Sequence, residues 1–198
     1  AASKLKAGLL PTDPAAFVGA PSDEGLDVMA TKVQAGDYSR ISKARFFSSY
    51  EGELSVQIGY PELCLNIAEG INRGWANGDA ADYYSKGILA SMNSYGITDA
   101  TVFSTYINQT TTKYKGNNTD GLVQILTQRY LALAQHSGLE AYYNWRRTKT
   151  PAFSEGGPGT GNSGKIPFRF QYPVNERNNN NKNYTEAIQR QFRNTVDS

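Results

Sequence analysis

The chain has 198 residues, which is enough for one domain with its own hydrophobic core or for a large piece of a bigger domain. Its 20 basic and 18 acidic residues give a formal net charge of +2 without a basic stripe, so the charge pattern gives no footprint of a nucleic-acid partner. No stretch approaches the roughly 18 to 20 apolar residues of a membrane helix, which excludes a helical span in this sequence.

The first 58 residues are rich in proline, glycine, serine and aspartate and lack a sustained helical period. We expect residues 1–58 to form an irregular segment. Short strands are possible in this N-terminal third, at residues 45–47 and 54–58, where the side chains alternate in polarity.

From Tyr60 onward, apolar residues recur at spacings of three and four, which predicts a mainly α-helical fold over residues 59–198. The first two helices should form an antiparallel pair of the tetratricopeptide type, because Ala68 and Ala80 allow close approach. Long irregular loops should join the helices, including a polar connection at residues 98–118. The predicted helices cover residues 60–74, 79–95, 119–137, 139–147 and 184–192.

The residue types that build common catalytic centres are scarce. Cys64 is the only cysteine and lies among leucines, so we predict a buried core thiol rather than a nucleophile. His136 is the only histidine and falls at the polar end of a predicted helix, where a surface or C-terminal capping role is expected. One cysteine and one histidine cannot form a zinc site, so we expect no metal, no cofactor and no enzyme activity.

Three stretches carry recognisable motifs in a fixed order. Residues 68–97 contain Ala-Glu, Arg-Gly-Trp, Gly-Asp-Ala and Gly-Ile-Leu-Ala-Ser-Met, and residues 125–151 contain Gln-Arg-Tyr followed by Trp-Arg-Arg-Thr and a proline. Residues 166–176 read Ile-Pro-Phe-Arg-Phe-Gln-Tyr-Pro-Val-Asn-Glu. Together these stretches resemble the C-terminal part of the SusD/RagB family, in its SusD-like branch. We expect Arg146, Arg147 and Arg169 to pair with carboxylates such as Glu69 or Glu176 in a structural role.

The resemblance implies a non-enzymatic binding protein. It implies a nutrient-binding lipoprotein on the outward-facing surface of the outer membrane, which captures a glycan or similar oligomer and delivers it to a TonB-dependent, SusC-like transporter. It also implies that this chain is a fragment, since the family's N-terminal half with its lipidated cysteine is not in the sequence. The stacking aromatics would then come partly or wholly from that missing half.

Thirteen tyrosines and many amide side chains fit glycan recognition, because flat rings stack on sugar faces while amides bind hydroxyl groups. Most of these rings lie at helical spacing, where packing in a core is expected. Tyr106 and Tyr114 lie between predicted helices, so they are the candidate ligand-binding residues within this chain.

Two other functions stay open from the residues alone. A stand-alone tetratricopeptide scaffold for protein partners would need several tandem helix pairs, and only one pair is visible. A glycan-cleaving enzyme would need two acidic residues at a shared cleft, and nothing places pairs such as Glu51 and Glu53 there.

Overall fold

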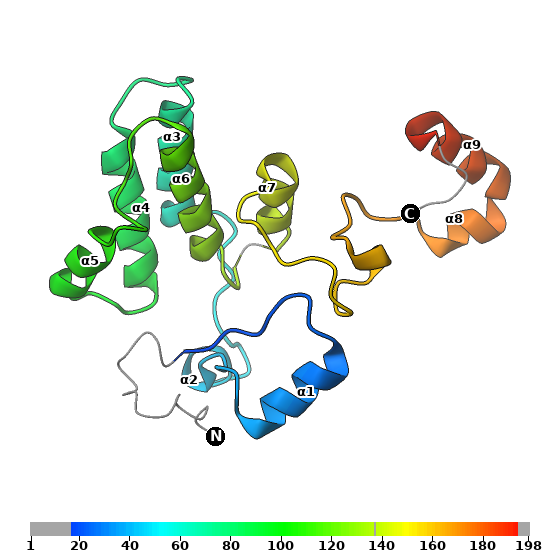
Figure 1. The fold of residues 1–198 in the computed structure, drawn as a ribbon, viewed down its shortest axis with the longest axis horizontal. Helices are drawn as coiled ribbons and strands as arrows, with labels where there is room; N and C mark the ends of the chain where they lie inside the picture. Colours follow the sequence, from blue (N-terminus) through cyan, green and yellow to red (C-terminus); the bar gives the residue numbers. More distant parts are fainter. Residues whose placement is uncertain (1–16, 137, 194–198) are drawn as a thin grey trace. The chain divides into compact units, whose positions relative to one another are not determined.

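The computed structural model describes residues 17–136 and 138–193, and every regular element in those ranges is helical. The chain divides into two compact units, one formed by residues 42–152 and the other, within the described ranges, by residues 17–41 and 153–193. In chain order the helices of Figure 1 are α1 (Leu26–Ala35), α2 (Lys43–Phe46), α3 (Tyr60–Asn72), α4 (Ala80–Ser94), α5 (Ala100–Ile107), α6 (Thr119–Ala132), α7 (Glu140–Thr148), the 3-10 turn η2 (Asn162–Gly164), α8 (Val174–Asn179) and α9 (Asn181–Phe192).

The unit of residues 42–152 is built on the pairing of α3 with α4, and α6 packs against both helices (Figure 1). Apolar residues from all three helices meet in one cluster, which confirms the expected helix pair and the mainly α fold. The buried members of this core cluster are Leu65, Ala68, Tyr84, Ile88 and Ile125.

Close approach of α3 and α4 depends on small side chains at their contact. A Cβ atom on Gly87 would lie 2.6 Å from Cγ of Leu65 and 3.2 Å from the carbonyl oxygen of Pro61. Ala68 and Ala80 are both buried, as the sequence predicts. Leu65 of α3 therefore fits against α4 because position 87 has no side chain.

Side-chain caps fix where the helices begin. Asp79 accepts hydrogen bonds from the backbone N–H groups of Ala81 and Asp82 at 2.9 and 3.4 Å, which starts α4 where the sequence predicts. The Asn118 side chain accepts from the N–H of Gly121 at 2.9 Å and begins α6 in the same way.

The core also contains a buried phenol. Tyr84 is fully buried and donates its hydroxyl hydrogen to the carbonyl oxygen of Thr112 at 2.8 Å. Burial raises the pKa of Tyr84, because the charged phenolate would lose its hydration in the core. This hydrogen bond joins α4 to the loop that precedes α6.

Several boundaries differ from those expected. Neither expected strand is present within the described residues, because residues 43–46 form α2 and residues 54–58 take no regular structure and no neighbouring strand pairs with them. The connection at residues 98–118 contains α5, which Asp99 caps by accepting from Thr101 at 2.7 Å. The helix expected to reach residue 137 ends at Ala132.

The other unit contains a helix that the sequence does not predict. Helix α1 lies within the segment expected to be irregular, and it ends at Gly36 in the left-handed conformation. The ammonium group of Lys32 and the hydroxyl of Tyr38 both donate to the Glu24 carboxylate, which fastens the helix to its flanking turns. Short-range polar contacts therefore stabilise α1 where its apolar pattern is weak.

Glycines in residues 156–164 contact the chain just before α1. The N–H of Gly159 donates to the carbonyl oxygen of Asp23 at 3.0 Å. A Cβ atom on Gly157 would lie 2.1 Å from that same oxygen, so only glycine fits there. In the same unit the asparagine-rich tract of residues 178–183 forms parts of α8 and α9.

Candidate functional site

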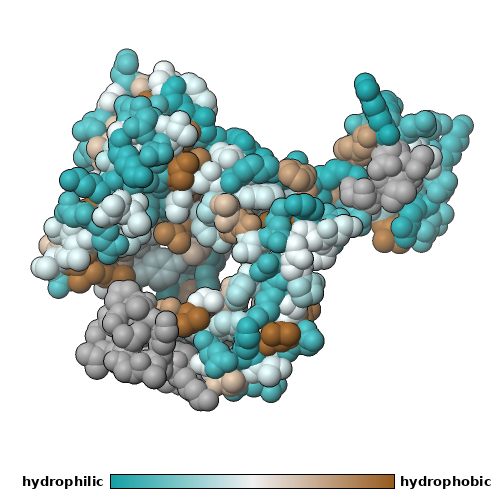
Figure 2. All heavy atoms as spheres, in the orientation of Figure 1, coloured by the Kyte–Doolittle hydropathy of each residue, from teal (hydrophilic) through white to brown (hydrophobic). Residues whose placement is uncertain are grey.

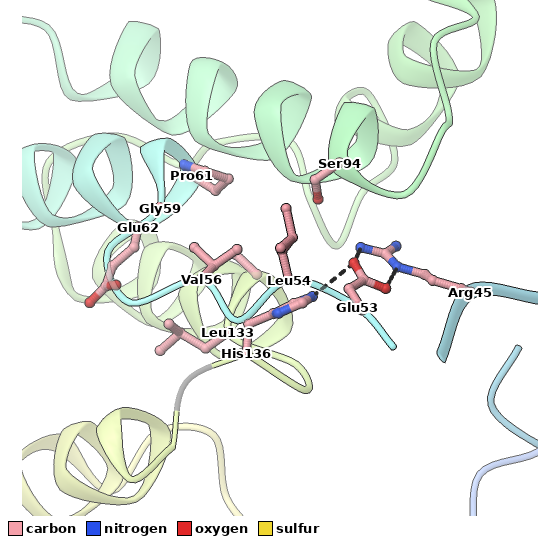
Figure 3. Close-up of a pocket in the computed structure, with 11 residues that line it drawn as sticks. Arg45, Glu53, Leu54, Val56, Gly59, Pro61, Glu62, Ser94, Leu133 and His136 are labelled. Atoms are coloured by element: carbon pink, nitrogen blue, oxygen red, sulfur yellow. Dashed lines mark hydrogen bonds and ion pairs between the residues drawn. The ribbon is translucent and has the colours of Figure 1, made fainter. Parts of the chain in front are cut away.

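One pocket of about 210 Å³ opens in the unit of residues 42–152 (Figure 3). The stretch that leads into α3 forms one wall, and the ends of α4 and α6 form the others. The lining residues are Arg45, Glu53, Leu54, Val56, Gly59, Pro61, Glu62, Ser94, Ala132, Leu133 and His136.

The polar end of the pocket is organised around Glu53. Both carboxylate oxygens of Glu53 accept hydrogen bonds from the Arg45 guanidinium group, and Nε2 of His136 lies 3.4 Å from Oε1 (Figure 3). The hydrogen bonds from Arg45 hold the pKa of Glu53 below its usual value, so this carboxylate is ionised at neutral pH. Arg45 also lies over the ring of Tyr95, with its guanidinium carbon 4.0 Å from the ring centre.

The arrangement does not fit catalysis. Glu53 is held by Arg45, and the Ser94 hydroxyl donates to the carbonyl oxygen of Ser91 at 2.7 Å, so neither group is poised as base or nucleophile. Cys64 is buried with 1% of its surface exposed, which confirms the predicted core thiol. The His136 side chain is 14% exposed, so it is mostly covered rather than a surface cap.

The walls of the pocket are aliphatic. Leu54, Val56 and Leu133 supply them, and no aromatic ring is among the lining residues. A sugar ring needs a flat apolar face to stack upon, together with amides or carboxylates that are free to bind its hydroxyl groups. The pocket therefore suits a small aliphatic group better than a pyranose ring.

An ionic network in the same unit centres on the buried Glu69 of α3. Nη1 and Nη2 of Arg147 donate to the two Glu69 oxygens at 2.6 and 2.8 Å, and Nε of Arg73 donates at 2.7 Å. Burial raises the pKa of Glu69, but the hydrogen bonds from Arg147 and Arg73 outweigh it and hold the pKa below its usual value. The predicted pairing of Arg147 with Glu69 is confirmed.

The network extends to α6 and α7. Nη2 of Arg129 donates to Glu62 at 3.3 Å, and its Nη1 lies 3.4 Å from Oδ1 of Asn144. The same Asn144 oxygen accepts from Arg147 at 2.7 Å. These hydrogen bonds and ion pairs join α3, α6 and α7, so we assign the network to stability and not to ligand binding.

The other two arginines of these motifs lie against aromatic rings. Arg146 lies over the Tyr142 ring, with its guanidinium carbon 5.8 Å from the ring centre. Arg169 donates to the carbonyl oxygen of Phe170 at 3.1 Å and lies over the Phe192 ring at 3.9 Å. Arg147 makes the fork with a carboxylate that the motif led us to expect.

The two candidate ligand-binding tyrosines are half-buried and lie against the core cluster. Tyr106 belongs to α5, and its hydroxyl exchanges hydrogen bonds with the Gln128 amide at 2.9 and 3.1 Å. The Tyr114 ring packs on Tyr84 with centroids 5.2 Å apart. Their rings do not project freely into solvent, because α5 and the loop after it fold onto α4 and α6. A ligand role for either residue stays a prediction.

The described residues also bear on membranes and metals. None of their helices combines the length and apolar composition needed to cross a bilayer. Within the same ranges, no cluster of acidic, histidine or cysteine side chains has a metal-binding arrangement.

Over residues 17–136 and 138–193, the fold is a helical scaffold, and its pocket has no organised catalytic centre. The sequence profile of the SusD-like family described as "Starch-binding associating with outer membrane" matches residues 15–173. The chain therefore belongs to the SusD-like family, whose members are binding proteins and not enzymes. The expectation of a SusD-like, non-catalytic protein is confirmed.

Solved structures agree with this assignment. A SusD homologue from Bacteroides fragilis is 27% identical with a TM-score of 0.77, and the match covers 92% of this chain and 42% of that one. An outer-membrane protein from Bacteroides vulgatus, whose description connects it with nutrient binding, is 24% identical with a TM-score of 0.72, over 92% and 41% of the two chains.

A chitin-binding protein is also similar, at 32% identity and a TM-score of 0.53, over 69% of this chain and 30% of that one. The chain thus spans less than half of the length of the solved relatives it matches. Among curated proteins, no sequence matches it.

Proposed function

We propose that the chain is the C-terminal part of an outer-membrane nutrient-binding protein, which binds a glycan and delivers it to a TonB-dependent, SusC-like transporter. The observation that carries the proposal is the family match over residues 15–173, because its description joins starch binding with the outer membrane. The similar chitin-binding protein supports an oligosaccharide as the ligand class.

The architecture supports a binding role in physical terms. Helices α3, α4 and α6 enclose one core, and the network around Glu69 fixes α7 to them, so the loops stand on a rigid base. Rigid helices that carry variable loops are a common design for binding proteins, since the scaffold holds the loops while their residues select the ligand.

We further propose that the full-length protein faces outward from the outer membrane and is held by an N-terminal lipid anchor. The family description supports the outer-membrane location. The solved relatives, which are more than twice as long as their matched part, support the proposal that this chain is a portion of a longer protein.

The test uses the full-length protein, purified from its own outer membrane through a C-terminal tag. Calorimetric titration with maltoheptaose and chitohexaose should give saturable binding of at least one of them, and mass spectrometry should identify a TonB-dependent barrel in the purified complex. Maltose and free glucosamine serve as small controls. Absence of binding to every oligosaccharide in a wider panel would refute the glycan assignment, and absence of the barrel would refute the delivery role.

A further inference from the structure

Trp75 occupies a fixed backbone position directly after α3. Its N–H donates to the carbonyl oxygen of Gly70 at 2.8 Å, and the N–H of Gly74 donates to Ile71 at 2.9 Å. Gly74 has a φ of +73°, in the left-handed region. These are the two hydrogen bonds and the glycine of a Schellman motif, so the helix end holds the tryptophan backbone in place.

The Trp75 ring is left uncovered at this position. In such motifs the residue in the place of Trp75 frequently packs on a side chain one turn back in the helix. Here the residue one turn back in the helix is Gly70, which has no side chain to pack on the ring. The preceding residue is Glu69, whose carboxylate is bound by arginines. The ring is therefore 71% exposed, whereas Trp145, the second tryptophan of the chain, is 6% exposed.

One face of the ring has a fixed neighbour. The guanidinium carbon of Arg73 lies 5.1 Å from the ring centre, and Nε of Arg73 donates to Glu69 at 2.7 Å. Because Glu69 is buried, its hydrogen bond to Arg73 holds the guanidinium group in place against the Trp75 ring. Most of the tryptophan surface is still exposed to solvent beside this contact.

The surroundings of Trp75 carry polar groups. Asn77 and Asp79 are exposed in the same short turn between α3 and α4, and Asp79 uses one carboxylate oxygen as a helix cap. Asn72 donates to the Tyr114 hydroxyl at 2.8 Å and to the Gly116 carbonyl at 3.3 Å, which brings the loop before α6 to this end of α3. An exposed indole face bordered by amides and a carboxylate is the chemistry that recognises sugars.

We infer that Trp75 is a stacking platform for a pyranose ring of the bound oligosaccharide, with Asn77 and Asp79 in reach of its hydroxyl groups. This inference rests on the proposed glycan-binding function. It places the ring contact at the α3–α4 turn and not in the aliphatic pocket, where no aromatic ring is among the lining residues.

The two tryptophans make the test specific, because only Trp75 is exposed. Maltoheptaose and chitohexaose are titrated into the 198-residue chain while tryptophan emission and acrylamide quenching are followed. The bound oligosaccharide should shift the emission and protect one of the two tryptophans from acrylamide. Trp75→Ala should weaken binding about tenfold and abolish the emission change, and Trp75→Phe should retain most of the affinity.

Tyr50→Ala serves as the matched control, since Tyr50 is another exposed aromatic residue in the same unit, and its substitution should not change the affinity. Circular dichroism of each variant should match the parent chain, because both rings lie outside the core. Equal affinity of Trp75→Ala and the parent would overturn the inference and leave the proposed function intact. Binding by the full-length protein but not by this chain would also overturn the inference about Trp75 and leave the proposed function intact. If neither protein bound an oligosaccharide, both the inference and the proposed glycan-binding function would be overturned.

Discussion

Glu69 joins more parts of the structure than any other acidic residue described above. Its carboxylate is 5% exposed, and it holds Arg147 of α7 and Arg73 at the end of its own helix. A buried carboxylate with two close guanidinium partners stabilises the folded chain only while it is ionised. Its effect on stability should therefore depend on pH.

We expect Glu69→Gln to lower the free energy of unfolding at pH 7 by about 3 kcal/mol, because the arginines lose their buried counter-charge. The folded-state pKa of Glu69 is lowered from 4.5, so its stabilising effect is complete above pH 4.5 and is lost as the pH falls through that lower pKa. Urea unfolding at a series of pH values measures the difference between parent and variant.

The difference in the free energy of unfolding between the parent and Glu69→Gln should become smaller as the pH falls below 4.5. The exposed Glu51 provides the control, since Glu51→Gln should change the stability by less than about 0.5 kcal/mol. A Glu69→Gln penalty that stayed constant down to pH 2 would show that packing, and not charge, accounts for the effect.

At the scale of the helix pair, two glycines with the same intrinsic cost have opposite surroundings. Gly70 in α3 has nothing within 4 Å of a built Cβ atom, whereas the Cβ of a residue at Gly87 in α4 would lie 2.6 Å from Leu65. Alanine gains about 0.5 to 1 kcal/mol over glycine within a helix. Packing should therefore decide whether alanine stabilises or destabilises the fold at each of the two sites.

We expect Gly70→Ala to raise the free energy of unfolding by about 0.5 to 1 kcal/mol, and Gly87→Ala to lower it by about 1 to 3 kcal/mol through overpacking of α3 on α4. Urea denaturation midpoints of the two variants provide the measurement. Similar midpoints for both would mean that the contact between α3 and α4 is looser than the described packing.

Element positions in this region follow from local signals. The apolar spacing and the Asp79 cap predict α3 and α4 to within two residues, because both signals are written in neighbouring residues. The sequence does not predict α5, because the helix has only eight residues and most of them are exposed. Helix α2 has only four residues, too few for a period to be visible.

At the scale of the whole molecule, the unit of residues 42–152 contains every residue of the core cluster and the whole Glu69 network. Outside it, the buried apolar residues among the described ranges are Tyr38 and Ile188. A unit that holds its own core should fold without the rest of the chain.

We expect the excised segment of residues 42–152 to be helical and to unfold in a single cooperative thermal transition, monitored by circular dichroism at 222 nm. Gly87→Ala within this segment should lower its Tm by several degrees, as about 1 kcal/mol shifts a domain of this size by roughly 4 to 8 °C. A gradual loss of signal without a transition would show that the core needs contacts from beyond these residues.

The sequence by itself determined the helix pair, the buried Cys64 and the family, because helical period, caps and ordered motifs are local or lie in fixed register. It left open which of Arg146, Arg147 and Arg169 would pair with Glu69, and the tertiary structure selected Arg147. The tertiary structure alone decided that Tyr106 and Tyr114 lie against the core and that Trp75 does not. Whether a ring is covered depends on which distant helix packs over it, or, for Trp75, on the absence of a side chain at Gly70 combined with a turn closed by left-handed Gly74. A stretch of neighbouring residues does not show which distant helix packs over a ring. The effect of Gly70 and Gly74 on the exposure of Trp75 is seen only when the end of α3 has folded.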